Sequence, residues 1–194
     1  MDLGPGPAAG VRAFAAVDIS NEARGDCARI LEALEAGGAD ARWTRSENLH
    51  LTLRFFGQTP PDRLRPLRTL LDEILRKTRP FLMRLGKLGV FPDARRPRVV
   101  WAAVEQGGAE LGRMAEELES GARAIGMEPE ERPFVPHLTL GRIRGGRSSG
   151  QIARLVASLE CRSGPMPVEE LVLYRSILSR EGPVYAVLEK FHLA

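Results

Sequence analysis

Two copies of the tetrapeptide His-Leu-Thr-Leu, at residues 50–53 and 137–140, contain two of the three histidines in this 194-residue chain. Imidazole titrates near neutral pH, so one ring of a pair can accept a proton while the other donates one. Alternate residues of a β-strand face the same side, so each copy presents a histidine and a threonine together. Two imidazoles and two hydroxyls suit phosphodiester hydrolysis, because one ring activates water, the other protonates the leaving oxygen, and the hydroxyls hold the phosphate oxygens.

The two copies keep one register, since the offset between their histidines is 137 − 50 = 87. The same offset aligns residues 14–18 (FAAVD) with residues 101–105 (WAAVE), without a gap. Two matching segments at one offset predict an internal duplication. If an approximate two-fold axis relates the halves, His50 and His137 face each other. A single His-x-Thr is more often a half-buried strand histidine with a satisfied ring; two copies in register reverse that preference and favour a paired site.

The hydrophobic pattern predicts strands and helices that recur in the same order in both halves. Because helices interleave with consecutive strands, we expect an α+β fold of two similar lobes, with mostly antiparallel sheets and outer helices around a central cleft. We expect residues 1–10, rich in Gly, Pro and Ala, to be disordered, and residues 11–194 to form a single bilobal domain. The expected strands are 11–19, 49–56, 81–88, 98–105, 136–143, 168–176 and 184–191, and the expected helices are 21–36, 60–75, 109–125 and 151–159.

Composition limits the possible partners. The net charge of +3 and the pI near 9.2 favour an anionic ligand but fall short of a non-specific nucleic-acid binder. No stretch approaches the roughly 18 apolar residues of a membrane span. Cys27 and Cys161 match no metal or disulfide spacing, so we expect free thiols in a reducing cytoplasm. Three histidines without clustered carboxylates or cysteines predict no metal site, and no cofactor is expected.

These residues resemble the 2H phosphoesterases, and specifically the RNA 2′,3′-cyclic phosphodiesterases, also called 2′-5′ RNA ligase-like proteins. The resemblance covers almost the whole chain. It implies a bilobal 2H phosphoesterase fold and opening of a 2′,3′-cyclic phosphate, on RNA ends or nucleotides, to a 2′-phosphomonoester. It also implies that His50 is the proton donor and His137 the proton acceptor. The matching segments are residues 12–17 (RAFAAV), 48–53 (NLHLTL) with 56–57 (FG), 89–92 (GVFP) with 96–99 (RPRV), and 136–142 (PHLTLGR).

Two further residues are candidates for substrate binding beside Thr52 and Thr139. The resemblance implies that Arg142 contacts phosphate. Arg142 follows His137 by five residues, so a regular strand would turn it to the opposite face, and a bulge or strand end near Gly141 must redirect it. Phe56 shares strand parity with His50 and could stack a nucleobase; the alternative is a core phenylalanine.

We therefore expect a monomeric, metal-independent cytoplasmic hydrolase of terminal 2′,3′-cyclic phosphates. A 2′-5′ RNA ligase, or a phosphodiesterase for linear 2′-5′ bonds, would use the same site, and the motifs do not separate these activities. An alternative of a different class is an RNA end-binding module whose cleft grips phosphate without turnover. The presence of both histidines and both threonines argues against that alternative.

Overall fold

The structure is a computed structural model that describes residues 10–38, 40–144, 149–179 and 182–194. The segment 1–10, which we expect to be disordered, lies outside the described residues except for Gly10. The elements are, in chain order, β1 (Val11–Asp18), α1 (Asn21–Ala36), β2 (Ala41–Trp43), the 3-10 helix η1 (Ser46–Asn48), β3 (His50–Thr59), α2 (Pro61–Leu75), β4 (Phe81–Phe91), β5 (Val99–Gln106), α3 (Gly108–Ala124), β6 (His137–Ile143), α4 (Ser149–Ser158), β7 (Met166–Val168), β8 (Glu170–Ser179) and β9 (Gly182–His192).

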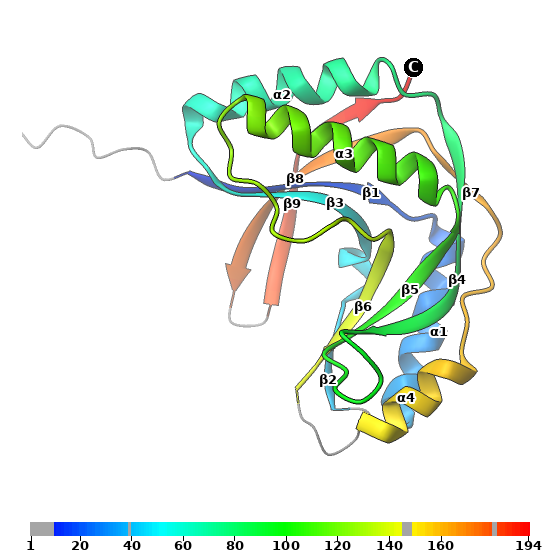
Figure 1. The fold of residues 1–194 in the computed structure, drawn as a ribbon. Helices are drawn as coiled ribbons and strands as arrows, with labels where there is room; N and C mark the ends of the chain where they lie inside the picture. Colours follow the sequence, from blue (N-terminus) through cyan, green and yellow to red (C-terminus); the bar gives the residue numbers. More distant parts are fainter. Residues whose placement is uncertain (1–9, 39, 145–148, 180–181) are drawn as a thin grey trace, which may run out of the picture.

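These strands form two antiparallel sheets, one in each lobe (Figure 1). One sheet has the order β3-β1-β8-β9, and the other has the order β2-β6-β5-β4-β7. Helices α2 and α3 pack on the outer side of the first sheet, and α1 and α4 pack on the second. The expected α+β class, with antiparallel sheets and outer helices, is confirmed. The two strands that begin with the motif histidines, β3 and β6, contact each other where the sheets meet.

The two halves of the chain exchange elements between the lobes. Strand β4 follows α2 in the sequence but joins the sheet of β5 and β6, whereas β8 follows α4 and joins the sheet of β1 and β3. The offset of 87 recurs here, because α1 begins at residue 21 and α3 at residue 108, and 108 − 21 = 87. Neither lobe is built from one half alone. We infer that residues 11–194 are a single unit that arose by duplication.

Both histidine motifs are anchored through their leucines. Leu51, Leu138 and Leu140 have no exposed surface, and Leu53 is 5% exposed. Each motif therefore buries alternate side chains in the core of its lobe and turns the histidine and threonine the other way. The predicted alternation holds within the two tetrapeptides.

Strands β2 and β7 are not predicted from the sequence, because three residues are too few to show an alternating pattern. Strand β2 matters for the site, since it forms the edge of its sheet beside β6. In this pair Arg42 lies opposite Arg142, and Trp43 lies opposite Gly141.

In the described part of the chain, no helix combines the length and the apolar character that crossing a membrane requires. Cys27 and Cys161 are both buried and free.

Candidate active site

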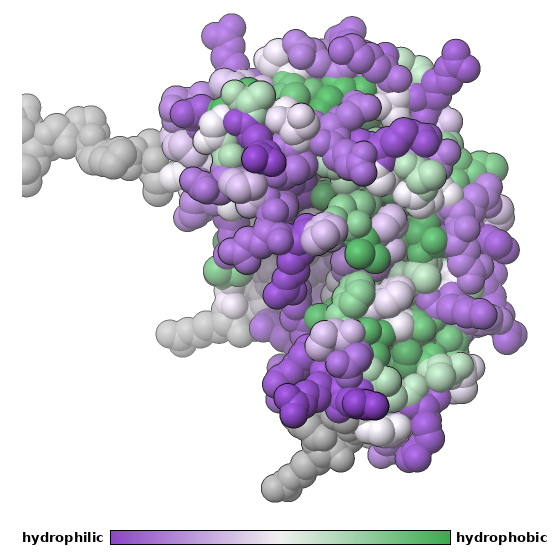
Figure 2. All heavy atoms as spheres, in the orientation of Figure 1, coloured by the Kyte–Doolittle hydropathy of each residue, from purple (hydrophilic) through white to green (hydrophobic). Residues whose placement is uncertain are grey.

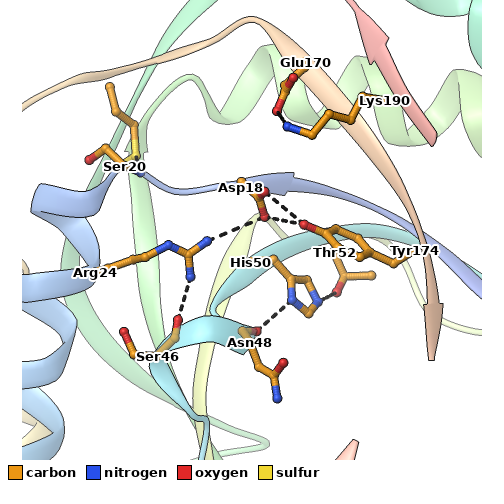
Figure 3. Close-up of polar contacts among 11 residues, drawn as sticks. Asp18, Ser20, Arg24, Ser46, Asn48, His50, Thr52, Glu170, Tyr174 and Lys190 are labelled. Carbon is orange, nitrogen blue, oxygen red and sulfur yellow. Dashed lines mark hydrogen bonds and ion pairs between the residues drawn. The ribbon is translucent and has the colours of Figure 1, made fainter. Parts of the chain in front are cut away.

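The imidazole of His50 is held by its own strand and by the preceding turn. Its Nδ1 lies 2.8 Å from the carbonyl oxygen of Asn48, and its Nε2 lies 2.9 Å from the hydroxyl of Thr52 (Figure 3). A carbonyl oxygen only accepts, so Nδ1 carries a hydrogen and the neutral ring accepts the threonine O–H at Nε2. The backbone thus selects one tautomer and leaves Nε2 as the atom that can exchange a proton with a ligand.

His137 is held in the same way. Its Nδ1 lies 2.7 Å from the carbonyl oxygen of Val135, which precedes it by two residues as Asn48 precedes His50. The neutral form of this ring therefore also has its lone pair at Nε2. Both lobes build a histidine whose reactive nitrogen is chosen by a backbone carbonyl.

Aromatic rings surround His50. The ring centroid of Phe14 lies 4.9 Å from that of the imidazole, Tyr185 meets it edge-on at 5.1 Å, and Tyr174 lies at 5.9 Å. These rings come from β1, β9 and β8, the other three strands of the sheet that contains β3. They exclude water from the faces of the imidazole and leave its Nε2 edge as the polar part.

His137 has two aromatic neighbours, Phe91 at 5.2 Å and Trp101 at 6.3 Å between ring centroids. Trp101 stands 101 − 14 = 87 residues after Phe14, so the two equivalent positions each place a ring beside the histidine of their own lobe. The conservative match between residues 14–18 and 101–105 thus has a structural counterpart.

The two strands that carry the motifs meet at the junction of the lobes. Strands β3 and β6 contact each other at the junction of the sheets, and Figure 2 shows the surface hollowed between the lobes. His50, Thr52, His137 and Thr139 are all partly exposed on these two strands. The arrangement can place a small anionic group within reach of two imidazoles and two hydroxyls.

A charged network supports His50 from β1 and α1. Asp18 is paired with His50 across the two strands, and the hydroxyl of Tyr174 donates to both of its carboxylate oxygens, at 2.8 and 2.9 Å. Arg24 lies 3.7 Å from the Asp18 carboxylate and donates to the carbonyl oxygen of Ser46 at 2.6 Å. Because Ser46 begins the turn that ends at Asn48, this network holds the carbonyl that orients the imidazole (Figure 3).

Burial lowers the pKa of His50 to about 4, and the charge of Arg24 acts in the same direction. The Asn48 carbonyl and the Asp18 carboxylate oppose this shift, because both favour the charged ring. Burial also raises the pKa of Tyr174, with the charge of Asp18 adding to the effect, so its phenol stays a donor. The ligand-free protein therefore holds His50 neutral near pH 7.

Arg142 is redirected by a bulge, as the sequence requires. In the pairing of β5 with β6, Val100 faces Gly141 and Trp101 faces Thr139, so Leu140 is the extra residue. Leu140 is buried and Arg142 is exposed, five residues after His137. The bulge reverses the alternation once and gives Arg142 the parity of the histidine.

The prediction that Phe56 shares a face with His50 is wrong. Strand β3 also bulges, because Leu53 has no partner in the pairing with β1, and this extra residue reverses the alternation. Phe56 is 9% exposed and belongs to the core, whereas Phe55 is 50% exposed. The Phe55 ring lies 5.5 Å from that of Phe14, which itself contacts the imidazole. Phe55 thus occupies the position that the sequence assigns to Phe56.

Sequence reasoning misses Asp18, Arg24, Tyr174 and Tyr185 as neighbours of His50. One signal was available for the tyrosines: the chain has only two, and both lie against this ring. Asp18 and Arg24 carry no comparable signal, since charged residues are frequent in the chain and their contact depends on the packing of α1. Among the residues that the structure describes, no three His, Cys, Asp or Glu side chains gather as metal ligands.

Comparison with known proteins gives one family and several full-length relatives. The family model described as LigT like Phosphoesterase matches the chain twice, over residues 17–101 and 102–185. An RNA 2′,3′-cyclic phosphodiesterase from Methanothermobacter thermautotrophicus is 38% identical over 184 residues, which cover 94% of this chain and 99% of the relative. The enzyme of the same name from Aeropyrum pernix is 35% identical over 167 residues, covering 84% of this chain and 93% of the relative.

Solved structures have the same fold. A crystal structure of a protein from Thermus thermophilus superposes with a TM-score of 0.76 at 31% identity, covering 94% of this chain and 97% of its own. LigT of E. coli in complex with 3′-AMP superposes with a TM-score of 0.77 at 26% identity, covering 96% of this chain and 99% of its own. The similarity thus extends over both lobes and the hollow between them.

Proposed function

The chain belongs to the LigT-like phosphoesterase family, within the 2H phosphoesterases, and we propose that it hydrolyses 2′,3′-cyclic phosphates on RNA ends or nucleotides to 2′-phosphomonoesters. Relatives that bear the name RNA 2′,3′-cyclic phosphodiesterase align over 84% and 94% of its length and support this activity. The E. coli relative in complex with 3′-AMP supports a nucleotide as the ligand of the cleft.

One observation carries the mechanism: both motif histidines donate Nδ1–H to the carbonyl two residues before them. In this proposal the two Nε2 atoms are the proton-transfer sites of one cleft. We assign His137 as the base, which takes a proton from water as the water oxygen attacks phosphorus. We assign His50 as the acid, which gives its Nε2 proton to O3′ as the P–O3′ bond breaks. The products are a 3′-hydroxyl and a 2′-phosphomonoester.

His50 must acquire its proton before it can act as an acid. Its pKa of about 4 in the free protein reflects burial, and an anionic phosphate beside Nε2 works against that shift. The Asp18 carboxylate acts in the same direction, and the surrounding ring faces stabilise a cation. Substrate binding itself therefore favours the protonated imidazole of His50.

The remaining site residues hold the phosphate in this proposal. Thr52 is next to Nε2 of His50, and Thr139 stands in the equivalent place beside His137. Their hydroxyls are proposed to donate to the non-bridging oxygens, while Arg142 neutralises the phosphate charge. Every proton in the reaction is moved by imidazole, so we propose that no metal or cofactor takes part. Action as a monomer and a cytoplasmic location stay predictions.

The test is hydrolysis of the four nucleoside 2′,3′-cyclic monophosphates in EDTA, with 2′ and 3′ products resolved by chromatography. We expect a 2′-phosphate product, and losses of roughly 10²-fold or more in His50→Ala and His137→Ala. His192→Ala is the matched control, because His192 is exposed at the end of β9, outside both motifs. A 3′-phosphate product would show that O2′ is the leaving group and would contradict the proposed cleavage of the P–O3′ bond, and full activity in both motif variants would contradict the mechanism.

A further inference from the structure

Two arginines stand directly opposite each other at the edge of the second sheet. In the pairing of β2 with β6, Arg42 is the register partner of Arg142, and both side chains are exposed. Like charges opposite each other in an antiparallel pair destabilise it. A bound anion between or beside the two guanidinium groups removes this repulsion.

Both side chains reach toward the site. The bulge at Leu140 gives Arg142 the parity of His137, and the guanidinium of Arg42 lies against Gly182, at the start of β9 in the other sheet. Arg42 therefore bridges the two lobes. A Cβ atom at position 182 would collide with it, so the glycine makes room for the guanidinium.

A third arginine, Arg12 of β1, acts on the same place. Burial raises the pKa of Tyr185, and the positive charges of Arg142, Arg12 and Arg42 oppose that shift, so all three lie within electrostatic reach of the phenol. The Tyr185 ring is 5.1 Å from the imidazole of His50. Over the described ranges, no carboxylate forms an ion pair with any of these three arginines.

This is more positive charge than one cyclic phosphate, a monoanion, requires. If Arg142 binds the cyclic phosphate, the nearby guanidinium groups of Arg42 and Arg12 have no anionic partner among the described residues. The next phosphate of a polynucleotide chain supplies such a charge at neighbouring distance, and a guanidinium fork matches its oxygens. Resting on the function proposed above, we propose that Arg42, assisted by Arg12, forms a second phosphate-binding site for the internucleotide phosphate that precedes the cyclic end.

Two substrates separate this second site from the first. A nucleoside 2′,3′-cyclic monophosphate has only the cyclic phosphate, whereas a tetranucleotide that ends in a 2′,3′-cyclic phosphate has three preceding phosphates. We expect the wild type to prefer the tetranucleotide in kcat/KM by at least about tenfold, the scale of one charge-assisted contact. We expect Arg42→Gln to lower kcat/KM about tenfold more for the tetranucleotide than for the monophosphate.

Salt dependence gives a second readout. Each phosphate contact to a single strand contributes about 0.7 to the slope of log affinity against log salt concentration. Arg42→Gln should reduce the tetranucleotide slope by about that amount, and Arg42→Lys, which keeps the charge, should retain it. The matched control is Arg65→Gln, since Arg65 is an exposed arginine on α2, outside the cleft, and its loss changes the net charge equally.

Binding keeps the test independent of turnover. The affinity of a fluorescent tetranucleotide ending in a 2′-phosphate, measured by anisotropy, should fall in Arg42→Gln more than that of a nucleoside 2′-monophosphate measured by calorimetry. If the wild type does not distinguish the two lengths, or if Arg42→Gln and Arg65→Gln weaken both ligands by the same factor, the second site is wrong. If neither cyclic substrate is turned over but the Arg42-dependent difference in binding remains, the proposed hydrolysis fails and the second site stands.

Discussion

The Nε2 atom of His50 and the hydroxyl of Thr52 lie 2.9 Å apart on the same side of strand β3. The Asn48 carbonyl occupies Nδ1, so in the free protein the threonine hydroxyl donates to the one nitrogen that can react. A phosphate that enters the hollow meets this hydroxyl and this nitrogen together. The Thr52 hydroxyl is thus placed to transfer its hydrogen bond from the ring to a phosphate oxygen. This change frees Nε2 to carry a proton.

The hydroxyl and the methyl of Thr52 can be tested separately. Thr52→Val keeps the shape of the side chain and removes the donor, so we expect kcat to fall by roughly tenfold or more, the scale of a lost hydrogen bond to a charged group. Thr52→Ser keeps the donor and should remain within a few-fold of the wild type. Steady-state kinetics with a cyclic mononucleotide measures both. Equal losses in the two variants would mean that the methyl group, through packing, matters more than the hydroxyl.

Binding of an anionic product should charge His50. Burial lowers its pKa to about 4, and an anion next to Nε2 raises it, so at a pH between the free and bound values the protein takes up a proton on binding. Affinity for a nucleoside 2′-monophosphate should therefore increase as the pH falls through this window. Calorimetry in buffers of different ionisation enthalpy measures the uptake, and His50→Gln is the control. Equal heats in all buffers would contradict the proposed charging of His50.

The charges on Asp18 and Arg24 act on His50 in opposite directions, which gives a prediction with two signs. In the complex with a nucleoside 2′-monophosphate, we expect Asp18→Asn to lower the pKa of His50, because a negative charge is lost. We expect Arg24→Gln to raise it, because a positive charge is lost. Nitrogen-15 NMR of the imidazoles reads the pKa and the tautomer directly, and the chain has only three histidines to assign.

Each variant in that experiment changes one of the titratable or charged groups around His50. Those that face His50 from the elements around it are Asp18 of β1, Arg24 of α1, Tyr174 of β8 and Tyr185 of β9, with Arg12, Arg42 and Arg142 acting on Tyr185. Tyr174→Phe is the matched variant, because it removes the hydrogen bond to Asp18 without changing any charge near pH 7. Shifts of the same sign in both charge variants would show a structural disturbance in place of the electrostatic effect.

The sequence predicts the parts of the site that depend on local alternation and fails where alternation is broken. The two tetrapeptides behave as regular strands, so His50 and Thr52 lie together as expected. At Leu53 the strand bulges, and nothing in the types of residues 53–56 predicts this, because a bulge is a property of the pairing with β1. The bulge before Arg142 is predicted only because the resemblance demands a contact that a regular strand forbids.

Contacts with residues far away in the sequence explain why the bulge at Leu53 in β3 cannot be predicted from the local sequence. Arg54, next to the bulge, is only 2% exposed, and its guanidinium is paired with Glu119 of α3 at 2.7 Å and with the Glu128 carbonyl at 2.7 Å. An arginine in a strand predicts an exposed position, and these partners, far away in the sequence, compensate for its burial together with the adjacent Phe55 carbonyl, which accepts from Nη1 at 3.1 Å. The backbone N–H of Phe55 donates to the Glu130 carboxylate at 3.0 Å, and this bond holds the part of β3 that follows the bulge.

Phe55 and Phe56 should therefore respond oppositely to truncation. Phe56→Ala removes a core ring that stacks under Arg54, and we expect a loss of about 3–5 kcal/mol in the free energy of unfolding. Phe55→Ala should leave that free energy within about 1 kcal/mol, since half of the ring is exposed, but should raise KM for a cyclic nucleotide. Urea denaturation and steady-state kinetics measure the two effects. A stable Phe56→Ala protein with raised KM would restore Phe56 to the site.

Gly141 links the stability of the sheet edge to the direction of Arg142. A Cβ at this position would run into the Trp43 ring and would lie 3.1 Å from the Arg42 carbonyl oxygen. We expect Gly141→Ala to cost about 1–3 kcal/mol in the free energy of unfolding, as overpacking does, and to lower kcat/KM because Arg142 follows directly. Trp43→Leu removes the clashing ring, so the double variant should lose less than the sum of the two single losses. A double-mutant cycle in urea, repeated with kcat/KM, checks both, and strict additivity would show that Trp43 is not what requires a glycine there.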